Sequence, residues 1–337
     1  MALFRRRTAV EAAPAGGSAP SSTARPPIRS ATVDPAALMR IKSLELRARL
    51  AVEGFVRGLH RSPYHGFSAE FREYRQYTPG DDPRYLDWKL YARTDRDYVK
   101  RYEDETNLRA LLVIDASRSM AYGSPAAGGT KGDYARTAAA SLALFLTRQR
   151  DAVGVATFDE RVTDYLPPRH PPGHFRRLLA VLGREPTGRG TSLDGPLEEV
   201  AALVRRRGLI VLFSDLLAPI DRLKARLGAL RARGHEVVVF RVLDPTEVSF
   251  AFDGPGQFRD LETGRTLPID PSIARADYLR RFADHAAEVN QACADLGVDL
   301  ADATTDRPIE RLLFDFLKAR RRFSPGAGRR SGTGGAR

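Results

Sequence analysis

From Asn107 onward, short apolar runs alternate with segments of helical periodicity, and this alternation leaves the chain few possible folds. The runs at 111–114 and 209–213 have the length and composition of strands that are buried on both faces. Between them, apolar residues recur at helical spacing and predict a helix of about 18 residues: Tyr134, Ala138, Leu142 and Phe145. Strands that alternate with helices are typical of a mostly parallel sheet flanked by helices. We therefore predict a doubly wound α/β domain over residues 107–320.

Other segments of this domain follow the same alternation. The further predicted strands are 152–158, 162–166, 236–242 and 298–303, and the further predicted helices are 175–182, 193–207, 223–233, 274–296 and 308–320. Residues 250–269 interrupt the alternation with several glycines, which predicts an inserted hairpin centred on 262–265.

Residues 33–106 have a different pattern and form a predicted N-terminal extension of the domain. Asp34 followed by Pro35 is typical of a helix N-terminus. The apolar residues that follow predict one amphipathic helix that runs to about His60. Residues 66–105 are rich in aromatic and turn-forming residues, so we expect short strands and loops there.

The net charge of +12 is concentrated at the two ends of the chain. Residues 1–32 carry +4 and residues 318–337 carry +7, which leaves +1 for the residues between them. A domain that reads a nucleic-acid groove concentrates basic residues on its folded part, so we expect no specific nucleic-acid partner. The composition of 1–32 and 321–337 predicts disordered basic tails, for which contact with an anionic surface stays open.

The single cysteine and the hydropathy pattern exclude several protein classes. Cys293 alone cannot form a disulfide within the chain or a cysteine-based zinc site. The longest apolar stretches are too short for a transmembrane segment, and no apolar region typical of a secretory signal follows the basic N-terminus. We expect a cytoplasmic protein.

Oxygen-bearing side chains gather where two predicted strands end. Asp115, Ser117 and Ser119 follow the strand at 111–114 as Asp-x-Ser-x-Ser, and Asp215 follows the strand at 209–213. Thr191 lies in a glycine-rich loop. Ligands of open α/β sheets bind outside the carboxyl ends of the strands, where these side chains are expected to meet. Their carboxylate and hydroxyl oxygens predict a site for Mg²⁺ or Mn²⁺ rather than for zinc.

The charge of this predicted site indicates what it binds. Two carboxylates neutralise a divalent cation and the hydroxyls add no charge, so the metal stays receptive to a further anionic ligand such as a partner's Asp or Glu. A purely structural alternative stays open, in which Asp115 and Ser119 cap the following turn and Asp215 caps its helix. Ser192 is an alternative to Thr191 as the ligand from the glycine-rich loop.

The predicted metal residues resemble the metal-ion-dependent adhesion site of von Willebrand factor A domains. The wider chain, over about 35–320, resembles a bacterial family of unknown function that carries the number 58. That resemblance depends on Glu-Phe-Arg-Glu-Tyr-Arg-Gln-Tyr-Thr-Pro-Gly-Asp-Asp-Pro-Arg at 70–84, Leu-Asp-Trp at 86–88 and Ala-Arg at 92–93. It implies a von Willebrand A-like fold and a non-enzymatic adaptor. The implied partner is a MoxR-type AAA+ ATPase, its client or both, in chaperone-like maturation or stress functions.

The resemblance also implies a role for each candidate ligand. Ser117 and Ser119 would coordinate the metal directly, and Thr191 would do so when a partner is engaged. Asp115 and Asp215 would act directly or through water.

Two further functions stay open on the sequence alone. One is a metal-dependent phosphoester hydrolase, although no nucleophile or general acid is visible. The other is a scaffold with a vestigial metal site, in which 66–105 binds the partner. The glycine-rich stretch 123–131 lacks the Walker spacing of a phosphate-binding loop. We interpret it as a flexible loop beside the metal site.

Overall fold

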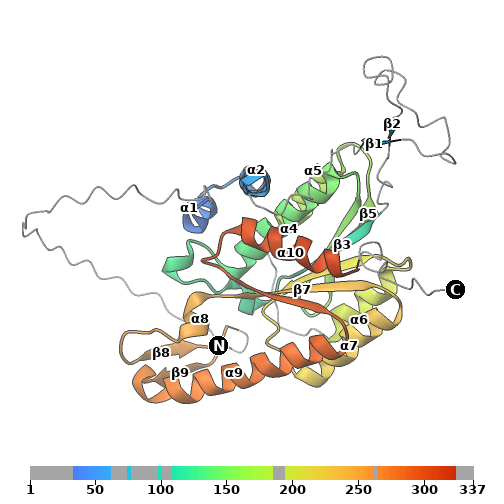
Figure 1. Cartoon of the computed structure of the whole chain (residues 1–337). Helices are drawn as coiled ribbons and strands as arrows, with labels where there is room; N and C mark the ends of the chain where they lie inside the picture. The colour runs from blue at the N-terminus through green and yellow to red at the C-terminus, as the bar shows by residue number, and fades with distance from the viewer. Residues whose placement is uncertain are drawn as a thin grey trace, which may run out of the picture.

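A six-stranded sheet forms the centre of the computed structural model, which describes residues 33–61, 74–76, 98–100, 108–184, 194–261 and 264–323 (Figure 1). Its strands are β3 (Arg109–Asp115), β4 (Ala152–Phe158), β5 (Val162–Arg169), β6 (Leu209–Ser214), β7 (Glu236–Leu243) and β10 (Asp299–Thr304). They lie in the order β10-β7-β6-β3-β4-β5. Neighbouring strands are parallel except for β5, which runs antiparallel to β4 at the edge. The predicted doubly wound, mostly parallel sheet is confirmed.

Helices cover both faces of this sheet. One layer consists of α1 (Pro35–Met39), α2 (Leu44–Arg61), α4 (Lys131–Arg148), α5 (His174–Leu182) and α10 (Ile309–Phe323). The opposite layer consists of α6 (Asp194–Leu203), α7 (Ile220–Ala232) and α9 (Pro271–Asp295). Within β3, Leu112 packs in the core under the first layer and Leu111 in the core under the second. Because both faces are buried, the central strands are almost uninterrupted apolar runs.

The N-terminal segment differs from the single helix that its periodicity predicts. Asp34 caps α1 as expected, since its side chain accepts a hydrogen bond from the Ala36 N–H at 3.2 Å. The helix ends at Met39, however, and α2 begins at Leu44. The Ser43 hydroxyl accepts from the Leu46 N–H at 3.3 Å, which is a new N-terminal cap. The prediction of one continuous helix is therefore wrong.

Helix α2 packs into the main hydrophobic core. The fully buried ring of Phe55 meets the ring of Phe145 on α4 edge-on, with centroids 5.4 Å apart. It also meets the ring of Phe314 on α10, with centroids 4.7 Å apart. The N-terminal extension thus shares its core with the sheet domain.

Two predicted boundaries are corrected by the structure. Strand β5 continues past residue 166 to Arg169 and includes Pro167 and Pro168, which an edge strand tolerates because one of its sides needs no partner. Helix α6 ends at Leu203 rather than at 207, because 204–208 form the connection to β6. Gly208 in that connection lies so close to β3 that a Cβ there would be 2.4 Å from the Arg109 carbonyl oxygen.

The predicted hairpin insertion is confirmed. Strands β8 (Gly256–Arg259) and β9 (Thr266–Ile269) pair antiparallel, directly before α9. A short helix that was not predicted, α8 (Pro245–Ser249), precedes the hairpin. Short 3-10 turns, η2 (Arg118–Ala121) and η3 (Pro125–Ala127), follow β3.

Part of the predicted extension and tails lies outside the described residues. Within 66–105 the structure describes β1 (Tyr74–Gln76) and β2 (Tyr98–Lys100), which pair antiparallel. Most of the family-signature stretch, the segment 1–32, the segment 324–337 and Thr191 are outside the described ranges. Helix α10 continues to Phe323, into the segment predicted as a tail. In the part of the chain that is described, no helix has the length and apolar character needed to cross a membrane.

Candidate metal centre

The predicted ligands lie at the carboxyl edge of the sheet, where β3 and β6 end side by side. The two strands are parallel neighbours, with Ile114 opposite Phe213, so Asp115 and the residues after Phe213 emerge together. The Ser214 hydroxyl donates to Asp115 Oδ2 at 2.6 Å. Asp215 follows immediately, and its Oδ1 accepts from the Leu217 N–H at 3.2 Å.

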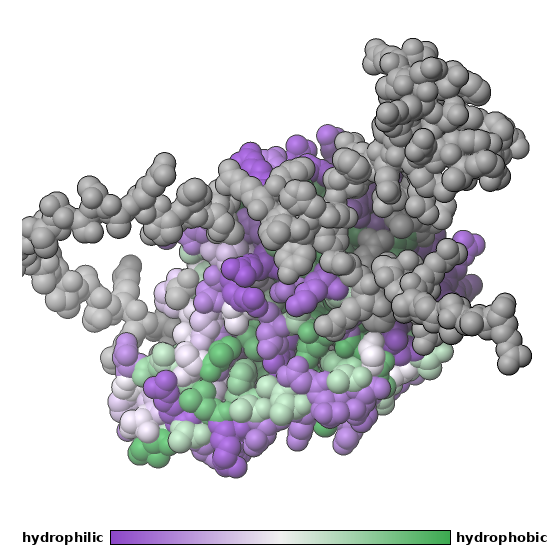
Figure 2. Space-filling view, viewed as in Figure 1, coloured by the Kyte–Doolittle hydropathy of each residue, from purple (hydrophilic) through white to green (hydrophobic). Residues whose placement is uncertain are grey.

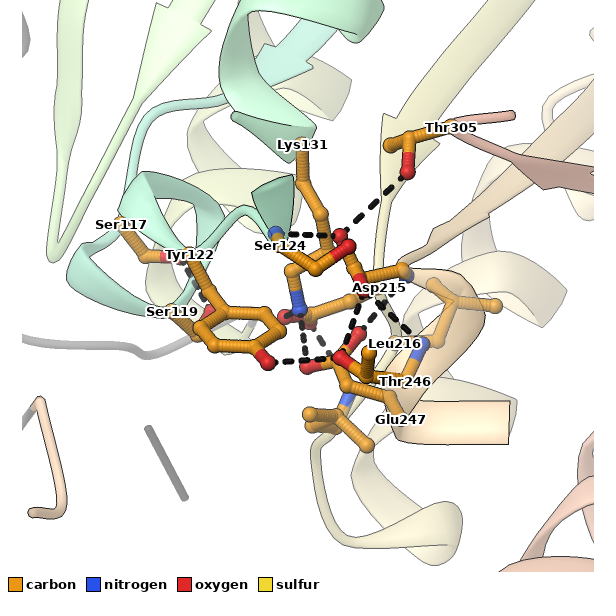
Figure 3. Close-up of polar contacts among 12 residues, drawn as sticks. Ser117, Ser119, Tyr122, Ser124, Lys131, Asp215, Leu216, Thr246, Glu247 and Thr305 are labelled. Atoms are coloured by element: carbon orange, nitrogen blue, oxygen red, sulfur yellow. Dashed lines mark hydrogen bonds and ion pairs between the residues drawn. The ribbon is translucent and has the colours of Figure 1, made fainter. Parts of the chain in front are cut away.

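The Asp-x-Ser-x-Ser loop curls around the same point. Asp115 Oδ1 accepts from the Ser117 N–H at 2.9 Å. The hydroxyl oxygens of Ser117 and Ser119 are 3.0 Å apart (Figure 3). The Ser119 hydroxyl is near enough to the Asp215 carboxylate to help lower the pKa of that group. The structure therefore brings together Asp115, Ser117, Ser119 and Asp215, whereas Thr191 is outside the described residues.

The two aspartates are almost completely buried and interact electrostatically. Each is 1% exposed. Burial, with the charge of Asp215 as a second cause, raises the pKa of Asp115 to about 6. Two carboxylates held this close in a dry environment repel each other, and a cation between them would relieve that repulsion.

Lys131, the first residue of α4, belongs to the same site. Its ammonium Nζ donates to Asp215 Oδ2 at 2.9 Å and to Glu247 Oε1 at 2.7 Å (Figure 3). The lysine side chain is 0% exposed. Burial alone would lower its pKa, but the attraction of the two carboxylates outweighs burial and raises the pKa above its usual value. For Asp215 burial would raise the pKa, and Lys131 outweighs it, so that this pKa is lowered.

The stretch 123–131 is packed, in contrast to the flexible loop that its glycines predict. The Lys131 N–H donates to the Tyr122 carbonyl oxygen at 2.8 Å, which closes the loop. A Cβ at Gly123 would be 2.3 Å from the Gly129 carbonyl oxygen, so only glycine allows this approach. The glycines thus allow a tight loop, which places Lys131 at the site.

Helix α8 supplies the other side of the site. Asp244 caps it and also accepts from the Ser124 N–H at 2.8 Å, which ties the helix to the loop after β3. Glu247 Oε2 accepts from the Asp244 N–H at 2.9 Å, so the carboxylate that holds Lys131 is itself fixed. The signal in the sequence is the capping box Asp-Pro-Thr-Glu directly after a buried strand, at the edge where ligands are expected.

The donor set and the charge of the site fit a divalent cation. The buried carboxylates of this region outnumber its buried ammonium. Lys131 pairs with Asp215 and Glu247, whereas Asp115 and Asp244 accept hydrogen bonds from uncharged groups. Among the described residues, no group of three or more His, Cys, Asp or Glu is placed to hold a metal, so a metal here depends on hydroxyls beside carboxylates. Oxygen donors of this kind suit Mg²⁺ or Mn²⁺, and an uncompensated buried negative charge favours a cation.

The doubly wound sheet, its antiparallel edge strand and the Asp-x-Ser-x-Ser loop after the central strand β3 define a von Willebrand A-like domain. The family model described as "Protein of unknown function DUF58" matches residues 73–288. The chain belongs to this family.

Relatives and solved structures extend this comparison. The chain is 31% identical over 294 residues to an uncharacterized protein of Mycobacterium tuberculosis, covering 86% of this chain and 91% of that protein. The solved structure of the conserved hypothetical protein BatB from Bacteroides thetaiotaomicron is similar at 13% identity and a TM-score of 0.42, covering 64% of this chain and 99% of that one. The solved structure of an aerotolerance-related membrane protein from Bacteroides fragilis is similar at 16% identity and a TM-score of 0.41, covering 63% of this chain and 99% of that one.

Proposed function

We propose that this protein is a non-enzymatic interaction module that binds an acidic side chain of a partner protein through a divalent cation. The observation that carries the proposal is the convergence of Asp115, Ser117, Ser119 and Asp215 at the carboxyl edge of β3 and β6. Thr191 completes the proposed ligand set. The cation would be Mg²⁺ or Mn²⁺, as the oxygen donors favour.

The hydroxyls and the carboxylates of the site would have different roles in binding a cation. The serine hydroxyls offer neutral oxygens, so they orient a cation without consuming its charge. Asp115 and Asp215 balance that charge from the protein side. When bound, the cation would supply a Lewis-acid position for a carboxylate oxygen from outside.

Exposed apolar side chains beside the site support a protein partner. Leu217 follows Asp215 by two residues and is 42% exposed, and Val248 follows Glu247 and is 39% exposed. The segment after α8 also exposes Leu267 at 60% and Ile273 at 80%. Figure 2 shows apolar residues among polar ones over the hairpin and α9. Such residues would add contact area around a central charged contact.

The partner that we propose is a MoxR-type AAA+ ATPase, its client or both, in a chaperone-like maturation or stress function. This part of the proposal rests on the resemblance of the sequence to its family. The domain limits at 33–106 and 107–320 and the cytoplasmic location that the sequence predicts belong to the same proposal. Cell fractionation tests the location.

A binding experiment tests the central claim. The tagged protein is used to capture partners from its native lysate in Mg²⁺ or in chelator, next to the variants Asp115→Ala and Ser119→Ala. The exposed aspartate Asp221 on α7 provides the matched control Asp221→Ala. We expect an ATPase or its client to be retained by the wild type and the control in Mg²⁺ only. Equal retention in chelator and by the site variants would contradict the metal-dependent mode.

An activity assay separates this proposal from the hydrolase alternative. The wild type is incubated with a generic phosphoester in Mg²⁺, with Asp215→Ala as the comparison. We expect no turnover above the buffer rate. Turnover that Mg²⁺ supports and Asp215→Ala abolishes would overturn the non-enzymatic role.

A further inference from the structure

A buried lysine at the centre of the candidate site is the feature that the proposed function leaves unused. The side chain of Lys131 is 0% exposed, and its ammonium lies between Asp215 and Glu247. Burying a charged amine is costly unless it is paired and hydrogen-bonded, and two carboxylates at 2.9 and 2.7 Å meet that need here.

Lys131 and a divalent cation would have opposite effects on the same carboxylate. Asp215 Oδ2 already accepts a hydrogen bond from Lys131 Nζ. A cation that approaches the Asp215 carboxylate must approach this ammonium too, and like charges a few ångströms apart in a dry site repel strongly. The ammonium and the cation therefore compete for Asp215.

Glu247 gives Lys131 a second charged partner, which can keep the ammonium paired when Asp215 coordinates a metal. Glu247 is fixed independently of Lys131, because its Oε2 accepts from the Asp244 N–H at 2.9 Å. The Tyr278 hydroxyl on α9 also donates to the Glu247 carbonyl oxygen at 2.9 Å. The ammonium would therefore keep a charged partner at 2.7 Å after losing the one at Asp215.

We infer that Lys131 sets the divalent-cation affinity of the site by competing for Asp215, and that Glu247 retains the displaced ammonium. The inference rests on the proposed function, since it concerns regulation of the same site. It assigns a determining role to two residues outside the Asp-x-Ser-x-Ser motif, contributed by α4 and α8.

Two single variants test this with opposite expected results, and Mn²⁺ affinity is the measurement, by calorimetric titration of the full chain. Lys131→Met removes the competitor with little change of side-chain length, so we expect at least tenfold tighter Mn²⁺ binding. Glu247→Gln leaves Lys131 dependent on Asp215, so we expect at least threefold weaker binding. The control Lys224→Met removes an exposed lysine that pairs with Asp295 at 3.1 Å, and it should leave the affinity unchanged.

The double variant Lys131→Met with Glu247→Gln separates the effect of competition for Asp215 from the effect of net charge on Mn²⁺ affinity. It also avoids the unpaired buried charge that could unfold a single variant. It removes one positive and one negative charge together, so the net charge of the site equals that of the wild type and no buried glutamate is left unpaired. Competition for Asp215 predicts that the double variant still binds Mn²⁺ at least tenfold more tightly than the wild type. Circular dichroism confirms that each variant is folded.

The outcomes distinguish failure of this inference from failure of the proposed function. Tighter binding by the double variant supports the inference, and so does binding that appears only when Lys131 is replaced. If the wild type binds Mn²⁺ and the double variant binds no more tightly, the inference is overturned while the metal site stands. If neither protein binds Mn²⁺, both the inference and the metal-dependent function are overturned.

Discussion

Replacing Asp115 by asparagine should change how the stability of the protein depends on pH. The Asp115 carboxyl is 1% exposed and lies beside the charge of Asp215. Burial first and this neighbour second raise its pKa from 3.8 to about 6. The folded state therefore binds a proton at this residue more tightly than the unfolded chain does. Asparagine keeps the shape and an acceptor oxygen for the Ser117 N–H but carries no charge.

The sign and size of the effect follow from linkage. A raised carboxyl pKa contributes stability that is fully present below about pH 4 and is lost as the pH rises through about 6. The difference between 3.8 and about 6 corresponds to about 3 kcal/mol of free energy of unfolding. The free energy of unfolding of Asp115→Asn, minus that of the wild type, should therefore increase by about 2.5 kcal/mol between pH 4 and pH 7.5, because a small part of the effect is already lost at pH 4.

Urea unfolding across this pH range, with chelator present throughout, measures the difference. Asp221→Asn, at an exposed residue of α7, provides the matched control outside the buried site. A constant difference for Asp115→Asn would refute the reasoning, because it would mean that the fold does not disfavour the charged carboxylate. A difference that falls with pH would refute it more strongly.

Two predictions concern the fold and are checked by urea unfolding at pH 7. Phe55→Ala should cost about 3 to 5 kcal/mol in one cooperative transition, because the ring is fully buried against α4 and α10; an early separate transition would contradict a shared core. Gly154→Ala should cost about 1 to 3 kcal/mol, because its Cβ would be 2.6 Å from the Leu166 carbonyl oxygen. The control Gly195→Ala should be neutral or stabilising, because its Cβ would be 3.6 Å from the nearest atom, and an equal loss in both variants would contradict the argument.

Most of the sheet could be predicted because its central strands are buried on both faces. Strands β3, β4, β6 and β7 are runs of apolar residues, and such runs predict a strand without knowledge of its neighbours. The predicted element boundaries that were wrong depend on single polar contacts or on the position of a strand in the sheet. The cap at Ser43 divides the first helix, and an edge position allows Pro167 and Pro168 to continue β5.

The candidate ligands could be predicted for a different reason, which is topology. Asp115 and Asp215 each follow a strand that reads as buried and parallel, so both carboxylates must emerge at the same edge of the sheet if those strands are neighbours. The serines then converge with Asp115 because the loop turns within a few residues, as the 2.9 Å bond from the Ser117 N–H shows. Local spacing and one topological rule were sufficient to place these four side chains together, and their role as metal ligands stays a prediction.

The place of Lys131 and Glu247 in the site could not be predicted from the sequence, because their contacts come from segments far apart in the chain. The partners of Lys131 are 84 and 116 residues away. A lysine at the start of a helix is normally solvated, whereas this one is 0% exposed and paired with Asp215 and Glu247. The same contacts give Lys131 an influence on the candidate metal site. Its buried ammonium hydrogen-bonds the Asp215 carboxylate. Any cation that binds Asp215 would therefore have to compete with this ammonium.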